Sequence, residues 1–327
     1  MIESTLDKVD TTTGFGPKIP RRIGWTFGFM LPLVATAVIL VQQLQRVPFE
    51  NWWSWSIQWE LLALVFLLSP VNWGFEIFKW AELLPHGSTA HRRREVLYGV
   101  AWSMVGPLRM GAVVGRVSAT RKNERNQGLR AFATASSAQW WCTVTGAALA
   151  VLLMGMFKTG AVLVLMSIAG ILLYFGWSPT FWKILQKMQI TGDWRLTRRI
   201  PKARRKTVLQ LSVGRYCVMI AQFVLVLNAF RHQESTAWFE RYLDQIMGGP
   251  VTWGLTSLAP TSLFGELGLR EAAALIALPA TTPADTAAII GAMLSLWVAN
   301  LLLPALYGLY LQNQYRNHPR HRSKLQG

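Results

Sequence analysis

Several stretches of this sequence hold about 20 mostly apolar residues in a row, the length that a helix needs to cross the hydrocarbon of a bilayer. The composition agrees, since 52% of the 327 residues are hydrophobic and 15% are charged, whereas an ordinary soluble domain has about 25% charged residues. We therefore expect an all-α polytopic membrane protein. The net charge of +17 does not indicate nucleic-acid binding, because in a membrane protein the position of the charges is more informative than their sum.

The apolar stretches divide into about six full transmembrane spans and two interrupted segments. The full spans are expected at residues 24–41, 57–80, 131–156, 161–177, 207–230 and 286–311. The interrupted segments, 96–114 and 246–279, contain glycine and proline, which weaken or break a helix. The helix breaks are expected at Gly106, Pro107, Pro260, Gly265 and Gly268. Residues 1–23 and the basic residues 312–327 are expected to be cytoplasmic tails around a transmembrane domain at 24–311.

The distribution of Lys and Arg predicts an orientation in the bacterial inner membrane. With both termini inside, and with both interrupted segments entering and leaving on one side, 26 of the 33 basic residues lie on the cytoplasmic side and 4 lie outside. Positive charge favours the cytoplasmic side. If segment 96–114 crossed fully, the five basic residues of 116–130 would lie outside. We therefore expect the two interrupted segments to be re-entrant.

The order of these segments indicates an inverted repeat. Residues 24–156 and 161–311 each follow the order span, span, interrupted segment, span, but begin on opposite sides of the membrane. Inverted repeats with discontinuous helices near the midplane are a recurrent transporter architecture. The two interrupted segments contain GPLRMG at 106–111 and PTSLFGELGLRE at 260–271, each with one arginine. We expect Arg109 and Arg270 to meet near the centre of the molecule.

Charged residues inside apolar stretches are the candidate functional residues, because a charge at the bilayer centre costs roughly 2.5 to 3.5 kcal/mol. A guanidinium group suits the geometry of phosphate, so an anionic headgroup is the expected ligand of Arg109, Arg116 and Arg270. The alternative is that these arginines pair inside the protein with Glu76, Glu266 or Glu271, which are the expected cavity or ion-pair residues.

Three further polar residues in apolar stretches have structural interpretations. Gln139 and Asn300 are expected to form hydrogen bonds between helices. Arg215 lies near the basic end of its span and is expected to extend its side chain to the interface.

Four short motifs in order carry a resemblance to a known family. They are NW..E..KW at 72–80, P.R.G...GR at 107–116, GELGLREA at 265–272 and W.AN...PAL.G at 297–308. Together they resemble the flippase-like membrane family named for the transmembrane region of lysylphosphatidylglycerol synthase. The resemblance implies lipid translocation. In the named enzyme this region is thought to move aminoacylated phosphatidylglycerol between leaflets, and other relatives handle hopanoids or glycolipids.

This chain departs from the family pattern in two ways. Ala112 stands where the family more usually has a glutamate, which weakens any acidic role at that position. No aminoacyl-transfer domain follows the basic tail, so the synthase activity is not expected.

The sequence as a whole predicts a lipid translocase that exposes a central polar cavity, formed by 106–116 and 260–271, alternately to the two leaflets. Its expected partners are anionic membrane lipids, with a homo-oligomer or an envelope-synthesis protein as further candidates. A non-transporting assembly factor for envelope-lipid synthesis is the first alternative. A membrane-embedded lipid transferase is the second, and it is disfavoured because the five histidines lie in expected loops or the tail.

No enzymatic activity, cofactor or metal is expected. There is no P-loop, so direct use of ATP is not expected. Cys142 and Cys217 lie in apolar runs and form no metal-ligand pattern.

Overall fold

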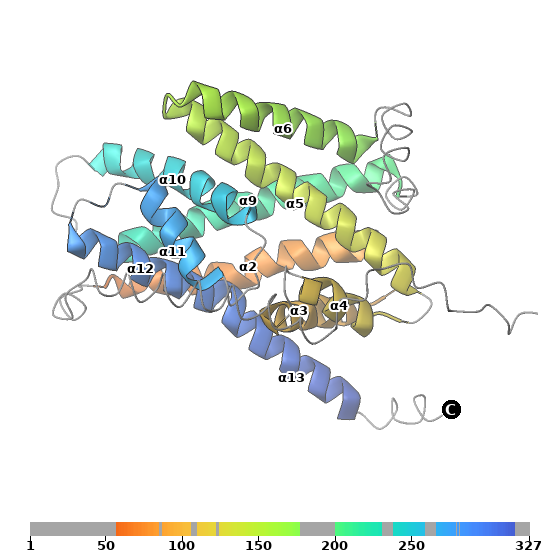
Figure 1. Cartoon of the computed structure of the whole chain (residues 1–327). Coiled ribbons are helices and arrows are strands. Elements are labelled where there is room, and N and C mark those ends of the chain that lie inside the picture. Colours follow the sequence, from red (N-terminus) through yellow and green to blue (C-terminus); the bar gives the residue numbers. More distant parts are fainter. Residues whose placement is uncertain are drawn as a thin grey trace, which may run out of the picture.

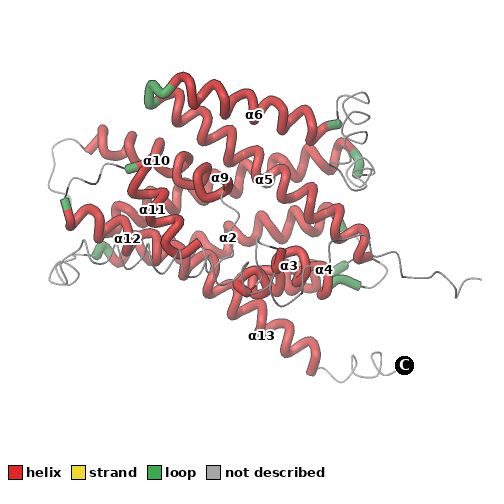
Figure 2. The backbone as a smooth tube through the Cα atoms, viewed as in Figure 1, coloured by secondary structure: helices red, strands yellow, loops and turns green. Residues whose placement is uncertain are grey.

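The computed structural model describes residues 57–84, 87–105, 110–121, 124–176, 200–230, 238–258, 266–278, 280 and 282–317. Every regular element within these ranges is helical, and none of the described residues forms a strand (Figures 1 and 2). The expectation of an all-helical protein is confirmed for this part of the chain. The first expected span, at 24–41, and the expected N-terminal tail lie outside the described residues. Of the expected C-terminal tail, residues 312–317 continue the last helix, and 318–327 lie outside the described residues.

Four helices are long and apolar enough to cross a membrane. They are α2 (Trp59–Leu83), α6 (Phe157–Phe175), α9 (Lys202–Phe230) and a continuous helix at Pro283–Tyr315. The last of these comprises α12 (Pro283–Trp297), a π-helical turn η4 (Val298–Leu302) and α13 (Leu303–Asn317). The fifth long helix, α5 (Arg125–Leu153), was expected to be a full span but is not among the four. The structure therefore indicates a membrane protein without confirming six full spans.

Helices α2 and α9 run antiparallel along their whole length at the centre of the molecule (Figure 1). At one end the amide of Gln58 donates to the carbonyl of Ala229, at 2.9 Å. At the other end Arg204 lies 4.0 Å from Glu82. Helix α5 packs beside α9, where the ring of Tyr216 occupies the space above Gly146. This antiparallel pair is the framework on which the other helices pack.

Two helical hairpins follow these central helices. In the first, α3 (Thr89–Val105) and α4 (Met110–Ala119) pack closely, because Gly111 and Gly115 leave no side chain between the two backbones. The guanidinium of Arg94, near the start of α3, donates to the carbonyl of Ala119 at the end of α4, at 3.2 Å. Both ends of this hairpin therefore lie on the same side.

The second hairpin is formed by α10 (Trp238–Leu258) and α11 (Glu266–Ala277). A Cβ atom on Gly248 of α10 would touch the side chain of Leu278, directly after α11. The order long helix, hairpin, long helix thus occurs twice, as α2, α3/α4, α5 and as α9, α10/α11, α12. This order matches the last three elements of each predicted repeat, while the inverted repeat itself stays a prediction. The turns of both hairpins, at 106–109 and 259–265, lie outside the described residues.

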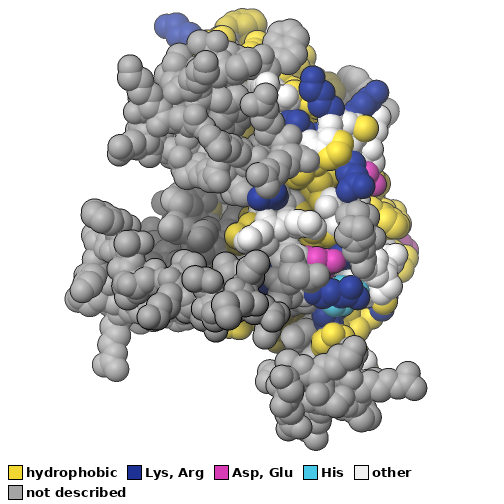
Figure 3. Space-filling model, turned by 90° about the vertical axis from the view of Figure 1, so that its right-hand side faces the viewer, with side chains coloured by type: hydrophobic (Ala, Val, Ile, Leu, Met, Phe, Trp, Pro, Cys, Tyr) yellow, Lys and Arg dark blue, Asp and Glu magenta, His cyan; other side chains and the backbone are white. Residues whose placement is uncertain are grey.

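One end of the helix bundle is rich in basic side chains. Figure 3 views this end, where α5 and α9 begin and where α2 and α6 end, and shows Lys and Arg over its described part. The exposed basic residues here are Arg121, Arg125, Lys202 and Lys206. At the opposite end, the turn between α5 and α6 is followed by Lys158. This asymmetry matches the expected cytoplasmic side, and the orientation itself stays a prediction.

The π-helical turn η4 is explained by Pro304. Proline has no N–H, so the carbonyl of Asn300, four residues earlier, loses its helical donor. The amide of Leu303 bonds to the carbonyl of Val298, five residues back, and so leaves the carbonyl of Ala299 without its usual partner. Two successive backbone carbonyls are therefore available to side chains from another helix.

Helix α2 supplies both donors. The hydroxyl of Ser69 donates to the carbonyl of Ala299 at 2.6 Å, and the indole N–H of Trp73 donates to the carbonyl of Asn300 at 2.8 Å. Ser69 and Trp73 are four residues apart and so lie on one face of α2. These bonds fix the register between α2 and the last long helix.

We predict that Gly308→Ala destabilises the protein while Gly74→Ala does not. A Cβ atom on Gly308 would collide with the backbone carbonyl of Leu97 in α3, whereas one on Gly74 would meet nothing within 4 Å. Overpacking of this kind costs about 1–3 kcal/mol, while Gly→Ala at an open helical site stabilises by about 0.5–1 kcal/mol. The unfolding temperature in detergent measures both. Equal temperatures for the two variants would contradict the close contact of α13 with α3.

Candidate functional site

Three polar residues of α2 share one face of the helix. Asn72, Glu76 and Lys79 are spaced by four and three residues, which places them one above another on a helix. All three are buried, although α2 is one of the four apolar helices. Lys79 is 0% exposed. Buried charge on such a helix is rare unless it is paired or lines a polar cavity.

The carboxylate of Glu76 binds three cations from three helices. Its Oε1 accepts from Arg116 of α4 at 2.8 Å. Its Oε2 lies 2.7 Å from Lys79 Nζ and 2.6 Å from an Arg215 nitrogen on α9. We call these four residues the Glu76 cluster. One carboxylate thereby joins α2, α4 and α9.

The Glu76 cluster has an excess of positive charge. Its three cations and one carboxylate sum to a formal charge of +2. No other acidic residue among those described forms an ion pair with Lys79, Arg116 or Arg215. Burying three cations with one carboxylate is costly. Each buried ion loses several kcal/mol of hydration free energy, and only an oppositely charged partner compensates for that loss.

Aromatic rings cover the two arginines of the cluster. The guanidinium carbon of Arg116 lies 5.5 Å from the ring centroid of Trp80 and 5.4 Å from that of Phe132. Arg215 lies 5.1 Å from the ring of Trp73. Cation–π contacts of this kind contribute about 0.5–2 kcal/mol. They hold the arginines in place without neutralising their charge.

A chain of hydrogen bonds extends from the cluster to the π-helical turn. Arg215 Nε donates to Asn72 Oδ1 at 2.9 Å, and Asn72 Nδ2 donates to Asn300 Oδ1 at 2.9 Å. Asn300 Nδ2 donates to Gln222 Oε1 at 3.1 Å, and Gln222 Nε2 donates to the carbonyl of Val65 at 2.9 Å. The expectation that Asn300 bonds between helices is confirmed.

On its other side the cluster reaches α5. Lys79 Nζ donates to Gln139 Oε1 at 3.1 Å, which confirms the expected interhelical role of Gln139. The other amide atom, Gln139 Nε2, and Arg116 Nε are both buried and have no hydrogen-bond partner among the described residues. The cationic site therefore has two hydrogen-bond donors, Arg116 Nε and Gln139 Nε2, that a further acceptor could bind.

A second buried cluster lies at the start of α3. Glu95 accepts from Trp80 Nε1 at 2.7 Å and from Arg92 at 2.8 Å, and it lies 3.0 Å from His91. Arg92 also bonds to Glu124 at 3.1 Å. Burial raises the pKa of Glu95, but the hydrogen bonds from His91, Arg92 and Trp80 outweigh it and lower the pKa. The expectation that His91 lies in a loop is wrong, since His91 is in the first turn of α3 beside Glu95.

Among the described residues, no group of His, Cys, Asp or Glu is arranged to hold a metal ion.

The structure places the expected site residues in two locations. Glu76 and Arg116 meet in the Glu76 cluster. Arg270, on α11, lies 4.9 Å from the ring of Trp253 on α10. Glu271 accepts a hydrogen bond from the amide of Gly268, at 2.5 Å, in the first turn of α11. Gly268 has a φ of 84°, in the left-handed region that favours glycine.

The remaining expected residues cannot be placed. Arg109, Gly106, Pro107, Pro260 and Gly265 lie outside the described residues, and the side chain of Glu266 is not described. The meeting of Arg109 with Arg270 therefore stays a prediction.

Two members of the Glu76 cluster were misplaced or missed. Arg215 was expected to extend to the interface, but it points inward to Glu76 and Asn72. Lys79, at the end of the expected span 57–80, was counted among the 26 cytoplasmic basic residues, because lysine after an apolar run usually marks the interface. The spacing of Asn72, Glu76 and Lys79 on one helical face was the signal that could have identified it.

Comparison with known proteins adds nothing to this assignment: no family model, no curated protein and no solved structure matches the chain.

We predict that Glu76→Gln destabilises the protein far more than Glu82→Gln. Removing the carboxylate leaves three buried cations unpaired, and breaking a buried ion pair costs about 3–5 kcal/mol. Glu82 is the matched control, because it lies on the same helix, is 37% exposed and pairs with Arg204 only at 4.0 Å. A pair of that kind contributes about 0–1 kcal/mol. Equal unfolding temperatures for the two variants would contradict the role of Glu76.

We predict that Glu95 stabilises the protein at neutral pH and not in acid. Its folded pKa lies below the ordinary value of 4.5, so the stabilisation is complete above about pH 4.5 and is lost as the pH falls through the folded pKa. Unfolding temperatures of the wild type and Glu95→Gln should differ at pH 7 and converge in acid. A difference that stays constant down to pH 3 would contradict the ion pairing of Glu95.

Proposed function

We propose that this protein binds an anionic membrane lipid and moves its headgroup across the membrane. The observation that carries the proposal is the Glu76 cluster, in which Lys79, Arg116 and Arg215 share one carboxylate inside apolar helices. A phosphate group is negatively charged and would offset part of the excess charge of +2. It would also accept hydrogen bonds from Arg116 Nε and Gln139 Nε2. Arginine is suited to phosphate because its planar fork donates in parallel.

The architecture supports movement as well as binding. Transporters built from inverted repeats place their site where discontinuous helices of the two halves meet. Two hairpins follow two long helices here, and Arg116 of the first hairpin belongs to the Glu76 cluster. In the proposed arrangement both hairpins are re-entrant, there are six full spans, and both termini are cytoplasmic. The inner membrane of a bacterium is the proposed location.

The proposed cavity combines the cluster with the expected arginines. Arg109 precedes Arg116 by seven residues in the sequence. Arg270 lies on the second hairpin. We propose that Arg116 holds the headgroup together with Lys79 and Arg215, and that Arg109 and Arg270 contact it during movement. The resemblance to the flippase-like family supports this assignment.

A non-transporting assembly factor is the second candidate. The dense pairing around Glu76 favours it, because three buried cations that already share a carboxylate can serve to hold α2, α4 and α9 together. This candidate needs no lipid substrate.

Transport of a fluorescent phosphatidylglycerol in reconstituted vesicles distinguishes the two candidates. We expect Arg116→Gln and Arg215→Gln each to slow transport about tenfold or more, because a hydrogen bond to a charged group contributes about 1.5–3 kcal/mol. Arg125→Gln is the matched control, since Arg125 is exposed at the start of α5. Phosphatidylcholine measures selectivity in the same vesicles. Absence of transport by folded wild-type protein, with no enrichment of anionic lipid on purification, would reject the proposal in favour of the assembly factor.

A further inference from the structure

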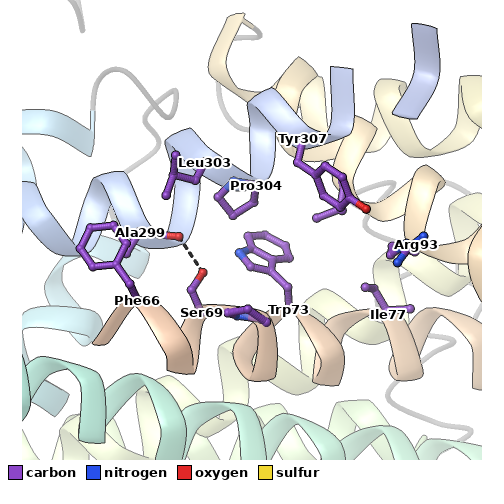
Figure 4. A pocket seen from close by; sticks show the side chains of 11 residues that line it. Phe66, Ser69, Trp73, Ile77, Arg93, Ala299, Leu303, Pro304 and Tyr307 are labelled. Atoms are coloured by element: carbon purple, nitrogen blue, oxygen red, sulfur yellow. Dashed lines mark hydrogen bonds between the residues drawn. The ribbon is translucent and has the colours of Figure 1, made fainter. Parts of the chain in front are cut away.

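A cavity of about 450 Å³ lies between α2, α3 and the last long helix (Figure 4). Its size falls within the range of about 300–1,000 Å³ that is usual for ligand pockets. The cavity is lined by Phe66, Ser69, Pro70, Trp73, Ile77, Arg93, Leu97, Ala299, Leu303, Pro304 and Tyr307. Most of this lining is apolar, and the hydroxyl of Ser69 is already bonded to the carbonyl of Ala299. The interior of the cavity therefore suits a hydrocarbon.

The two ends of the cavity differ in chemistry. Phe66, Ala299 and Leu303 form one end, while Arg93 and Tyr307 lie at the other (Figure 4). Arg93 is exposed, and its guanidinium carbon lies 5.9 Å from the ring of Tyr307. No acidic residue among those described pairs with Arg93. A ligand that fits both ends has an apolar chain and an anionic group.

The surroundings of the cavity indicate that the ligand comes from the membrane. Leu303 and Tyr307 line the cavity and are also 47% and 43% exposed on a helix apolar enough to span a bilayer. In a membrane these residues face lipid. The lining residues Phe66 and Ile77 are eleven positions apart on α2, which is about 16 Å along a helix. This length suits much of an extended acyl chain.

We propose that this cavity binds one acyl chain of an anionic phospholipid, with the phosphate on Arg93. The proposal takes the class of ligand from the proposed function and adds a second site for it, in which the phosphate contacts Arg93 and not the Glu76 cluster. Trp73 connects the two sites, since its ring lines the cavity and also lies 5.1 Å from Arg215 of the Glu76 cluster. The indole of Trp73 therefore borders both the cavity and Arg215 of the Glu76 cluster.

A photo-crosslinking residue at position 303 tests what occupies the cavity. The full-length protein is reconstituted in vesicles of phosphatidylglycerol and phosphatidylcholine with equal acyl chains, irradiated and analysed by mass spectrometry. Position 306 is the matched control, because Leu306 is exposed on the same helix and does not line the cavity. We expect phosphatidylglycerol adducts to exceed phosphatidylcholine adducts at 303 and to match them at 306. Arg93→Gln should reduce that preference about fivefold, while Arg125→Gln should leave it unchanged.

Two kinds of crosslinking result would overturn the proposal. Crosslinks from position 303 to this chain's own residues 1–56, or to a second copy, would show that protein fills the cavity. Equal adducts of the two lipids at 303, or a preference that survives Arg93→Gln, would remove Arg93 as the phosphate contact. The transport assay reports on the Glu76 cluster separately. Lipid adducts at 303 without transport would keep this site and reject translocation, and transport without such adducts would do the reverse.

Discussion

The carboxylate of Glu76 is the contact on which the interior of this molecule depends. It binds side chains from α2, α4 and α9 within 2.8 Å, and it lies inside a helix apolar enough to cross a membrane. Pairing in a low-dielectric interior strengthens each attraction but also makes every unpaired charge expensive. A single carboxylate balances only one of the three cations. The contact that joins the helices therefore leaves an excess of positive charge that another anion would offset.

A second constraint comes from the backbone. Pro304 interrupts the last long helix, and the resulting π-helical turn frees two carbonyls that Ser69 and Trp73 of α2 satisfy. Asn300, in the same turn, continues the hydrogen-bond chain toward Arg215. π-helical turns inside α-helices are frequent at functional sites. Here one turn lines the apolar cavity through Ala299 and is linked through Asn72 to the Glu76 cluster, so a change of its backbone would affect both.

The sequence predicted the helical class and named Glu76 as either a cavity or an ion-pair residue, because apolar length and helical spacing are local properties. It did not predict the inward orientation of Arg215 or the burial of Lys79. Both depend on which residue of a distant helix faces them, and α9 is far from α2 along the chain. The cavity beside Trp73 was also missed, since its walls come from segments more than 200 positions apart. The meeting of Arg109 with Arg270 stays a prediction.

The central claim is that an anionic lipid offsets the excess positive charge of the Glu76 cluster. The most direct measurement is the unfolding temperature of delipidated protein after addition of phosphatidylglycerol or of phosphatidylcholine with the same acyl chains. A ligand that binds only the folded state raises this temperature. We expect a larger rise with phosphatidylglycerol than with phosphatidylcholine, and we expect this difference to shrink in Arg116→Gln and to persist in Arg125→Gln. An equal rise with both lipids, or a difference unchanged in Arg116→Gln, would contradict it.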